Sequence, residues 1–212
     1  MSEREPAWQP GTGGLMGLPW TAGIGEAPDP RARLLDIATA TVGLSFSEPT
    51  RERYVAALFD DEPAVRGYSM AQAMSSCALL VRACWRKFGL TDRRLVAPYV
   101  PGQVFSDLVA MAREAGAWRA PGLIDSVEPG DCIMVTGPEH VLIVESTSSE
   151  DDGGVDVITS IDGGQRDELN SWAIKRRVRR VGAGPSLVSA DGSGRSVLGW
   201  IDWSAVAAKF GG

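Results

Sequence analysis

The fold of this chain is organised around residues 75–89, which read SSCALLVRACWRKFG. The two serines favour the N-terminal cap of a helix, the apolar residues after them recur at helical spacing, and Gly89 favours the end of the helix. The stretch therefore predicts a helix with one apolar face. That face consists of Leu80, Val81, Cys84, Trp85 and Phe88.

Cys77 falls in the first turn of this predicted helix. Unpaired backbone amides and the helix dipole favour negative charge at that end, and this lowers the pKa of a thiol. Such a cysteine can act as a nucleophile when a base lies nearby. The alternative is a small buried residue at a helix start. The stretch alone leaves both interpretations open.

The single histidine of the chain, His140, lies in residues 129–145, which read PGDCIMVTGPEHVLIVE. This pattern predicts a turn, a strand, a short Gly-Pro turn and a second strand that begins with the histidine. A polar residue at the start of a strand is expected at the end of a sheet, facing a helix that packs there. His140 is therefore the candidate base for Cys77.

Together, the helix-start cysteine and the strand-start histidine resemble the NlpC/P60 and CHAP group of papain-like cysteine peptidases and amidases. The matching pieces are residues 76–81, the Pro-Gly-Asp turn at 129–131 and residues 140–144, and the resemblance spans about residues 30–202. It implies a papain-like, NlpC/P60-type α+β fold in which N-terminal helices pack on an antiparallel β-sheet.

The order of predicted elements indicates the same class. Helices are expected first and strands second, which is typical of an α+β fold with helices on one side of an antiparallel sheet. The helices are expected near 30–42, 49–59, 75–89 and 104–115, and the strands at 131–135, 140–146, 155–161, 173–181 and 198–203. Residues 182–195 are interpreted as a Gly/Ser-rich loop, and residues 1–29 as an irregular Gly/Pro/Trp-rich arm before one domain at 30–212.

A third polar residue is needed to orient the histidine and fix its tautomer. The resemblance implies that this group lies on the strand after the histidine strand, where Asp162 is the first choice and Gln165 and Ser160 are the alternatives. Because Asp-Gly is also a common turn dipeptide, a turn role for Asp162 remains equally open.

Donors for the oxyanion of an attacked carbonyl are expected close to the sulfur. The Cys77 backbone amide is the first candidate, and Ser76 lies beside it. The resemblance adds Gln72, in the role that a glutamine has in papain-type enzymes, and Tyr68, because NlpC/P60-like sites often hold a tyrosine before the cysteine. Gln72 can equally be a surface-loop residue.

Composition excludes several classes of function. The net charge of −6 argues against nucleic-acid partners and anionic membranes, and the basic run at 175–180 is interpreted as the solvated face of a strand. Three cysteines do not describe a disulfide framework, so Cys84 and Cys132 are expected to be structural. With one histidine and scattered cysteines, no metal site or other cofactor is expected.

No stretch has the length of a membrane span, and the first thirty residues lack a signal-peptide pattern. The chain is therefore expected in the cytoplasm as synthesised, which allows equally a cytosolic substrate or delivery to a cell wall by a phage or secretion system. The resemblance implies a cysteine hydrolase that cuts an amide bond in bacterial peptidoglycan, or a related peptide. Two alternatives remain: a non-catalytic binding or assembly module, and an acyltransferase or deamidase that uses the same cysteine. The oligomeric state is not predicted.

Overall fold

The computed structural model describes residues 29–59, 76–98, 100, 102–136, 139–149 and 154–211. Its helices are α1 (Pro30–Thr39), α2 (Arg51–Phe59), α4 (Ser76–Phe88), α5 (Arg93–Val96), α6 (Gln103–Glu114), a 3-10 helix (Pro121–Ser126) and α7 (Trp203–Phe210). Its strands are β1 (Trp118–Arg119), β2 (Cys132–Val135), β3 (His140–Ser148), β4 (Val157–Arg166), β5 (Trp172–Val181), β6 (Ser186–Ser189) and β7 (Gly194–Ile201). The predicted arm at 1–29 lies outside the described residues except for Asp29. Tyr68 and Gln72 also lie outside them.

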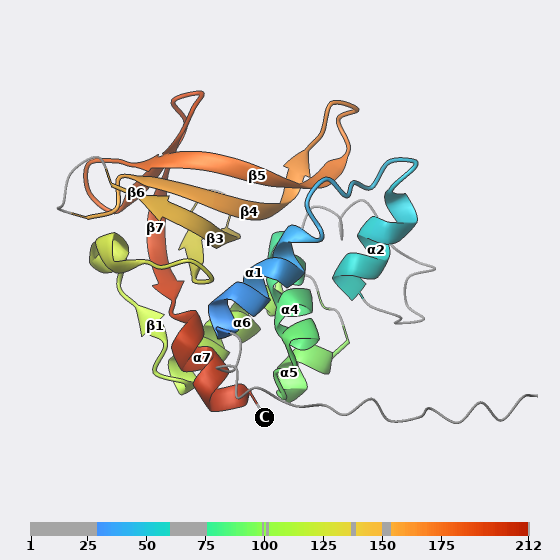
Figure 1. Ribbon diagram of the computed structural model, residues 1–212, viewed down its shortest axis with the longest axis horizontal. Helices are drawn as coiled ribbons and strands as arrows, with labels where there is room; N and C mark the ends of the chain where they lie inside the picture. Colours follow the sequence, from blue (N-terminus) through green and yellow to red (C-terminus); the bar gives the residue numbers. More distant parts are fainter. Residues whose placement is uncertain are drawn as a thin grey trace, which may run out of the picture.

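The strands form a closed barrel. They follow the order β1-β7-β2-β3-β4-β5-β6, and β6 also pairs with β7, so that β2 to β7 make a six-stranded antiparallel ring. The helices flank this barrel (Figure 1). The expected papain-like, NlpC/P60-type arrangement, with helices packed on an open sheet, is therefore wrong.

The strand that closes the barrel lies in a segment whose composition suggested a loop. Strand β6 is only four residues long, and Leu187 is its one buried residue. It pairs with β5 on one side and with β7 on the other. Short polar strands flanked by glycine and serine carry a weak sequence signal. The expected strand at 198–203 was also too short, because β7 starts at Gly194 and helix α7 follows it.

Alternation along the strands separates two cores. On β3, Leu142 and Val144 join the cluster that fills the barrel, whereas Val141 and Ile143 join the cluster shared with the helices. Interior positions of a small barrel are filled by side chains in this way. Helix α4 lies against α1, α2 and α6 and against β3 and β4. It is consequently buried all round from Ser76 to Trp85, rather than along the single face that its spacing predicted.

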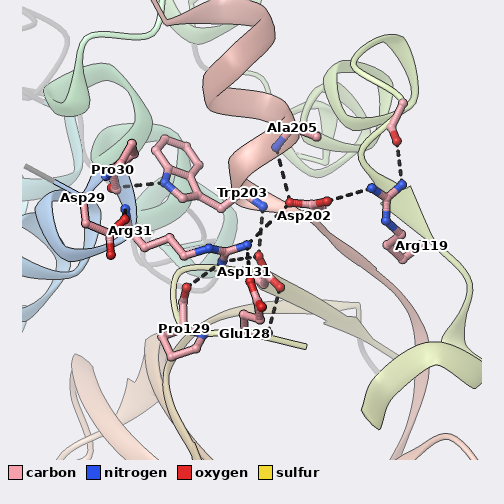
Figure 2. Close-up of polar contacts among 11 residues, drawn as sticks. Asp29, Pro30, Arg31, Arg119, Glu128, Pro129, Asp131, Asp202, Trp203 and Ala205 are labelled. Atoms are coloured by element: carbon pink, nitrogen blue, oxygen red, sulfur yellow. Dashed lines mark hydrogen bonds and ion pairs between the residues drawn. The ribbon is translucent and has the colours of Figure 1, made fainter. Parts of the chain in front are cut away.

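A buried carboxylate joins α1, the Pro-Gly-Asp turn and α7 (Figure 2). Asp131 is fully buried, and its Oδ1 accepts hydrogen bonds from Arg31 Nη1 at 2.7 Å and from the Trp203 amide at 3.0 Å. Its Oδ2 accepts from the Glu128 amide at 2.9 Å. The arginine also donates to the Pro129 carbonyl at 2.7 Å. Asp131 of the predicted turn therefore holds the helical layer against the start of β2.

Replacing Arg31 with methionine is expected to lower the free energy of unfolding by about 3 kcal/mol, because it leaves the buried Asp131 carboxylate without its cation. Urea denaturation at pH 7 measures the loss. The control is Arg176→Met: Arg176 pairs with Glu145 but is 49% exposed, so its loss is expected to leave the midpoint nearly unchanged. Equal midpoints for the two variants would show that the network does not stabilise the fold.

Candidate active site

Three elements that meet at one end of the barrel carry the candidate residues. Cys77 is the second residue of α4, His140 is the first residue of β3, and Asp162 lies within β4. Strands β3 and β4 are neighbours, and α4 packs against both of them. The structure thus brings together a cysteine, a histidine and a carboxylate that span 85 positions of the sequence, from 77 to 162.

The three side chains form a hydrogen-bonded series. His140 Nε2 lies 2.8 Å from Asp162 Oδ2, and the His140 ring is close enough to the Cys77 thiol for hydrogen bonding and charge to lower the pKa of that thiol. Because Nε2 is taken by the carboxylate, Nδ1 is the ring nitrogen that remains available to the thiol. All three residues are buried, with exposed fractions of 7% for Cys77, 8% for His140 and 0% for Asp162.

The surroundings favour a thiolate next to an imidazolium. Burial alone raises the pKa of Cys77, but the hydrogen bond and charge of His140, with the backbone amides of Val141 and Ala78, lower that pKa overall. Burial alone lowers the pKa of His140, yet its bonds to Asp162 and Cys77 raise it to about 9. Between these two pKa values the proton resides on the imidazole, so the sulfur is the charged nucleophile.

Asp162 has a second charged partner that the sequence did not indicate. Arg179 of β5 donates hydrogen bonds to Asp162 through both terminal nitrogens. Ser160, which is on β4 like Asp162, also donates to the Asp162 carboxylate. Burial raises the pKa of Asp162, but His140 and Arg179 outweigh this and hold it well below its usual range. The basic run was interpreted as a solvated strand face. Its other arginines are exposed, but Arg179 is 7% exposed, so this interpretation is wrong for that residue.

A pair of glycines allows β4 to contact the start of α4. Two residues of β4, Gly163 and Gly164, lie opposite the single residue Ile174 of β5, and this arrangement is a β-bulge. Gly164 has a φ of 68°. A Cβ atom on Gly163 would lie 2.5 Å from the Ser76 carbonyl oxygen. Asp162 therefore lies in a bulged strand rather than in a turn, and the bulge sets its strand directly against the cysteine.

Replacing Gly163 with alanine is expected to move the start of α4, because the new methyl group collides with the Ser76 backbone. We expect the alkylation rate of Cys77 to fall about tenfold and the free energy of unfolding to fall by about 1–3 kcal/mol. Mass spectrometry after iodoacetamide treatment and urea denaturation give the two values. Gly122→Ala is the control, since Gly122 is exposed and a Cβ there meets nothing within 4 Å. A Gly163 variant that matches it would contradict the prediction.

The remaining sequence candidates occupy supporting positions. Ser76 is fully buried, and its Oγ accepts a hydrogen bond from the Tyr54 hydroxyl at 2.9 Å. Gln165 Nε2 donates to the Gly163 carbonyl at 3.4 Å, so its amide is directed to the bulge rather than to the histidine. Cys84 and Cys132 are free thiols that are each 1% exposed, and burial raises the pKa of Cys132 well above its usual value.

Comparisons of the chain with protein-family models, with curated proteins and with solved structures found no match. Among the described residues, no group of three or more histidine, cysteine or acidic side chains is placed to hold a metal ion. Over the same ranges, none of the helices is both long and apolar enough to cross a membrane. The inference of function therefore depends on the chemistry of the buried side chains and on the sequence resemblance.

Proposed function

We propose that this chain is a cysteine hydrolase that cleaves an amide bond through a thioester on Cys77. The observation that carries the proposal is the hydrogen-bonded series of Cys77, His140 and Asp162 at the start of a helix. A cysteine that only fills space at a helix start needs neither a charged base nor a carboxylate that orients that base. The three groups fit the roles of nucleophile, proton carrier and orienting residue.

The acylation step uses the proton that His140 already holds. The Cys77 thiolate attacks the amide carbonyl carbon, and a tetrahedral intermediate forms with its negative charge on oxygen. The His140 imidazolium gives its Nδ1 proton to the amine nitrogen, so the C–N bond breaks and the amine leaves. Throughout this step the Asp162 carboxylate accepts a hydrogen bond from His140 Nε2–H and stays ionised. This bond keeps the ring in the orientation that the transfer requires.

Deacylation returns the site to its starting state. Neutral His140 takes a proton from water, and the hydroxide attacks the thioester carbonyl. The C–S bond then breaks, so that the carboxylic acid leaves and the Cys77 thiolate faces an imidazolium again. The sum is one amide and one water converted to an acid and an amine.

Stabilisation of the oxyanion is assigned to the first turn of α4. The amides of a first helical turn have no partner within the helix, and the helix dipole favours negative charge there. The Cys77 amide lies in this turn beside the sulfur, where the carbonyl oxygen of an attacked amide would come to rest. The oxyanion donor in this proposal is therefore the Cys77 amide. Ser76 is buried and is assigned a structural role at the start of α4.

Peptidoglycan is the proposed substrate, cut within the stem peptide or at the junction with the sugar. The support is the resemblance of residues 76–81, 129–131 and 140–144 to NlpC/P60 and CHAP enzymes. Only the site chemistry and the substrate class are taken from that resemblance, since the barrel differs from the fold that it implied.

Digestion of purified peptidoglycan by the native protein and by Cys77→Ala tests the proposal, with the soluble products identified by mass spectrometry. New fragments from the native protein alone are expected, and their masses identify the bond. Cys84→Ala is the matched control, because Cys84 is a free, buried thiol on the same helix but seven residues after Cys77, beyond the first turn. Absence of fragments together with slow alkylation of Cys77 at pH 7 would contradict the hydrolase and favour a binding module.

Fast alkylation of Cys77 without release of fragments would keep the nucleophile and reject peptidoglycan as its substrate. The acyltransferase and deamidase alternatives are separated in the same assay. Ammonia release from a glutamine-containing protein indicates a deamidase. Incorporation of an added primary amine indicates an acyltransferase.

A further inference from the structure

Strand β5 has one position where the usual placement of charged and apolar side chains is reversed. Val178 is 58% exposed, whereas the next residue, Arg179, is 7% exposed. A guanidinium group is costly to bury unless its charge is paired and its donors are used. The position of Arg179 therefore calls for a partner that compensates the burial.

That partner is the Asp162 carboxylate, which Arg179 contacts with both terminal nitrogens. Nη2 donates to Oδ2 at 2.6 Å, and Nη1 donates to Oδ1 at 3.2 Å and to the Ser160 hydroxyl at 2.5 Å. Ser160 in turn donates to Oδ1 at 2.6 Å. With the His140 bond at 2.8 Å, each carboxylate oxygen accepts two hydrogen bonds. These bonds hold the Asp162 carboxylate in one orientation and favour its ionised form.

We infer that Arg179 is a positioning residue of the candidate active site, which keeps Asp162 ionised and aimed at His140 so that the buried cluster stays electrically neutral. The cluster consists of Cys77, His140, Asp162 and Arg179. The inference rests on the proposed function in so far as it assigns the same nucleophile and base. It adds a fourth charged residue and a reason for its burial.

Neutrality holds in both protonation states of the cysteine–histidine pair. With the proton on sulfur, the negative Asp162 balances the positive Arg179. With the proton on the ring, thiolate and imidazolium add one charge of each sign, and the sum is again zero. Arg179 thus cancels the charge of Asp162 in both states, so the buried cluster carries no net charge, which would be expensive there.

Other titratable side chains on the surrounding elements differ in burial, and Arg82 of α4 is 3% exposed. Lys175 and Arg177 of β5 are the register partners of Asp162 and Ser160, and Arg177 is exposed while Lys175 is half-buried. Glu139, next to His140 in the chain, is exposed, and the buried Tyr54 hydroxyl donates to Ser76. Solvent screens the charges of exposed groups. Arg179 donates to both oxygens of Asp162, so it is the cation expected to act most strongly on that carboxylate.

Loss of the Arg179 charge is expected to move two titrations in the same direction. The remaining cluster would carry one negative charge in excess, which disfavours the thiolate and favours the imidazolium. The pKa of Cys77 and the pKa of His140 both rise, and the pH window of the ion pair moves upward as a whole. A residue that only fills space would change the amplitude of these titrations but leave their midpoints in place.

The test compares Arg179→Gln, which keeps a donor but loses the charge, with Arg179→Lys, which keeps the charge. The control is Arg177→Gln on the exposed part of the same strand. Alkylation of Cys77 by iodoacetamide is followed against pH by mass spectrometry. NMR follows the imidazole of His140, the one histidine of the sequence, after removal of any histidine tag.

For Arg179→Gln we expect both midpoints to rise by about one pH unit, which slows alkylation about tenfold below the thiol pKa. In Arg179→Lys, which keeps the charge, both midpoints are expected to lie close to their native values. Arg177→Gln is expected to have the native midpoints. A folded Arg179→Gln variant with native midpoints would overturn the inference. Neither readout needs a substrate, so failure to digest peptidoglycan would not be mistaken for failure of this inference.

If Arg179→Gln does not fold, the double variant Asp162→Asn/Arg179→Gln supplies the decision. It removes both charges together, so it is expected to fold and to unfold at a higher urea concentration than Asp162→Asn. The His140 midpoint in this variant should fall below the native value, since the carboxylate that raises it is gone. A double variant that also fails to fold would overturn the inference.

Discussion

Replacing His140 with glutamine is expected to lower kcat for amide hydrolysis by a factor of about 10²–10⁴, because the variant lacks the group that protonates the leaving amine and later deprotonates water. Release of amine from a defined muropeptide measures the rate. Glu139→Gln is the control, since Glu139 precedes the histidine but is exposed. A His140 variant with native kcat would assign the proton transfers to another group.

The same residue sets a limit on the alkaline side of the native pH–rate profile. The imidazolium is the acid in the first step, and its pKa is raised to about 9, so activity should decline as the pH rises through that value. The residual activity of His140→Gln should not show this decline. Persistence of the decline near pH 9 in the variant would show that a different group titrates there.

Replacing Asp162 with asparagine is expected to lower the free energy of unfolding by about 3–5 kcal/mol at pH 7, because Arg179 stays buried without its carboxylate. Urea denaturation gives the value, and Asp191→Asn, at an exposed carboxylate of the β6–β7 loop, is the control with a native midpoint. The kcat should fall as well, since the amide no longer holds the imidazolium as a carboxylate does.

The stability difference between Asp162→Asn and the native protein should depend on pH. The native pKa of Asp162 is lowered, so the carboxylate contributes its stability above the ordinary pKa of an aspartate, and this contribution is lost as the pH falls through the native pKa. The two denaturation midpoints are therefore expected to converge in acid. A constant difference from pH 7 to the lowest pH at which both fold would contradict the linkage.

Features with a local cause were predicted from the sequence. The helix at 76–88 was predicted from the serine pair and the apolar spacing, and β3 begins at the expected histidine. Cys77 and His140 were identified because each begins a strongly patterned element. The placement of Asp162 beside His140 was a hypothesis based on the family resemblance, and in the structure Asp162 Oδ2 lies 2.8 Å from His140 Nε2.

Features that depend on pairing between distant strands were not predicted. Arg179 belongs to an alternating basic strand, and nothing in that alternation tells which face turns inward. The choice follows from the register of β5 on β4, where Ile158 lies opposite Arg179 and Asp162 is within reach. The closure of the barrel was missed for a similar reason, because β6 acquires its strand character from its two neighbours rather than from its own residues.

The closed ring also determines how an extended substrate can be held. A free strand edge offers unpaired amides and carbonyls to a peptide, which can then add to the sheet as a further strand. Strand β3 is paired with β2 and β4, and β4 is paired with β3 and β5, so the two strands that carry His140 and Asp162 have no such edge along their paired residues. Along these paired residues a peptide cannot add as a further strand, so a peptide substrate of the proposed hydrolase would be held by side chains, by loops, or by backbone beyond the last β3–β4 pair, Ile143 with Ile161.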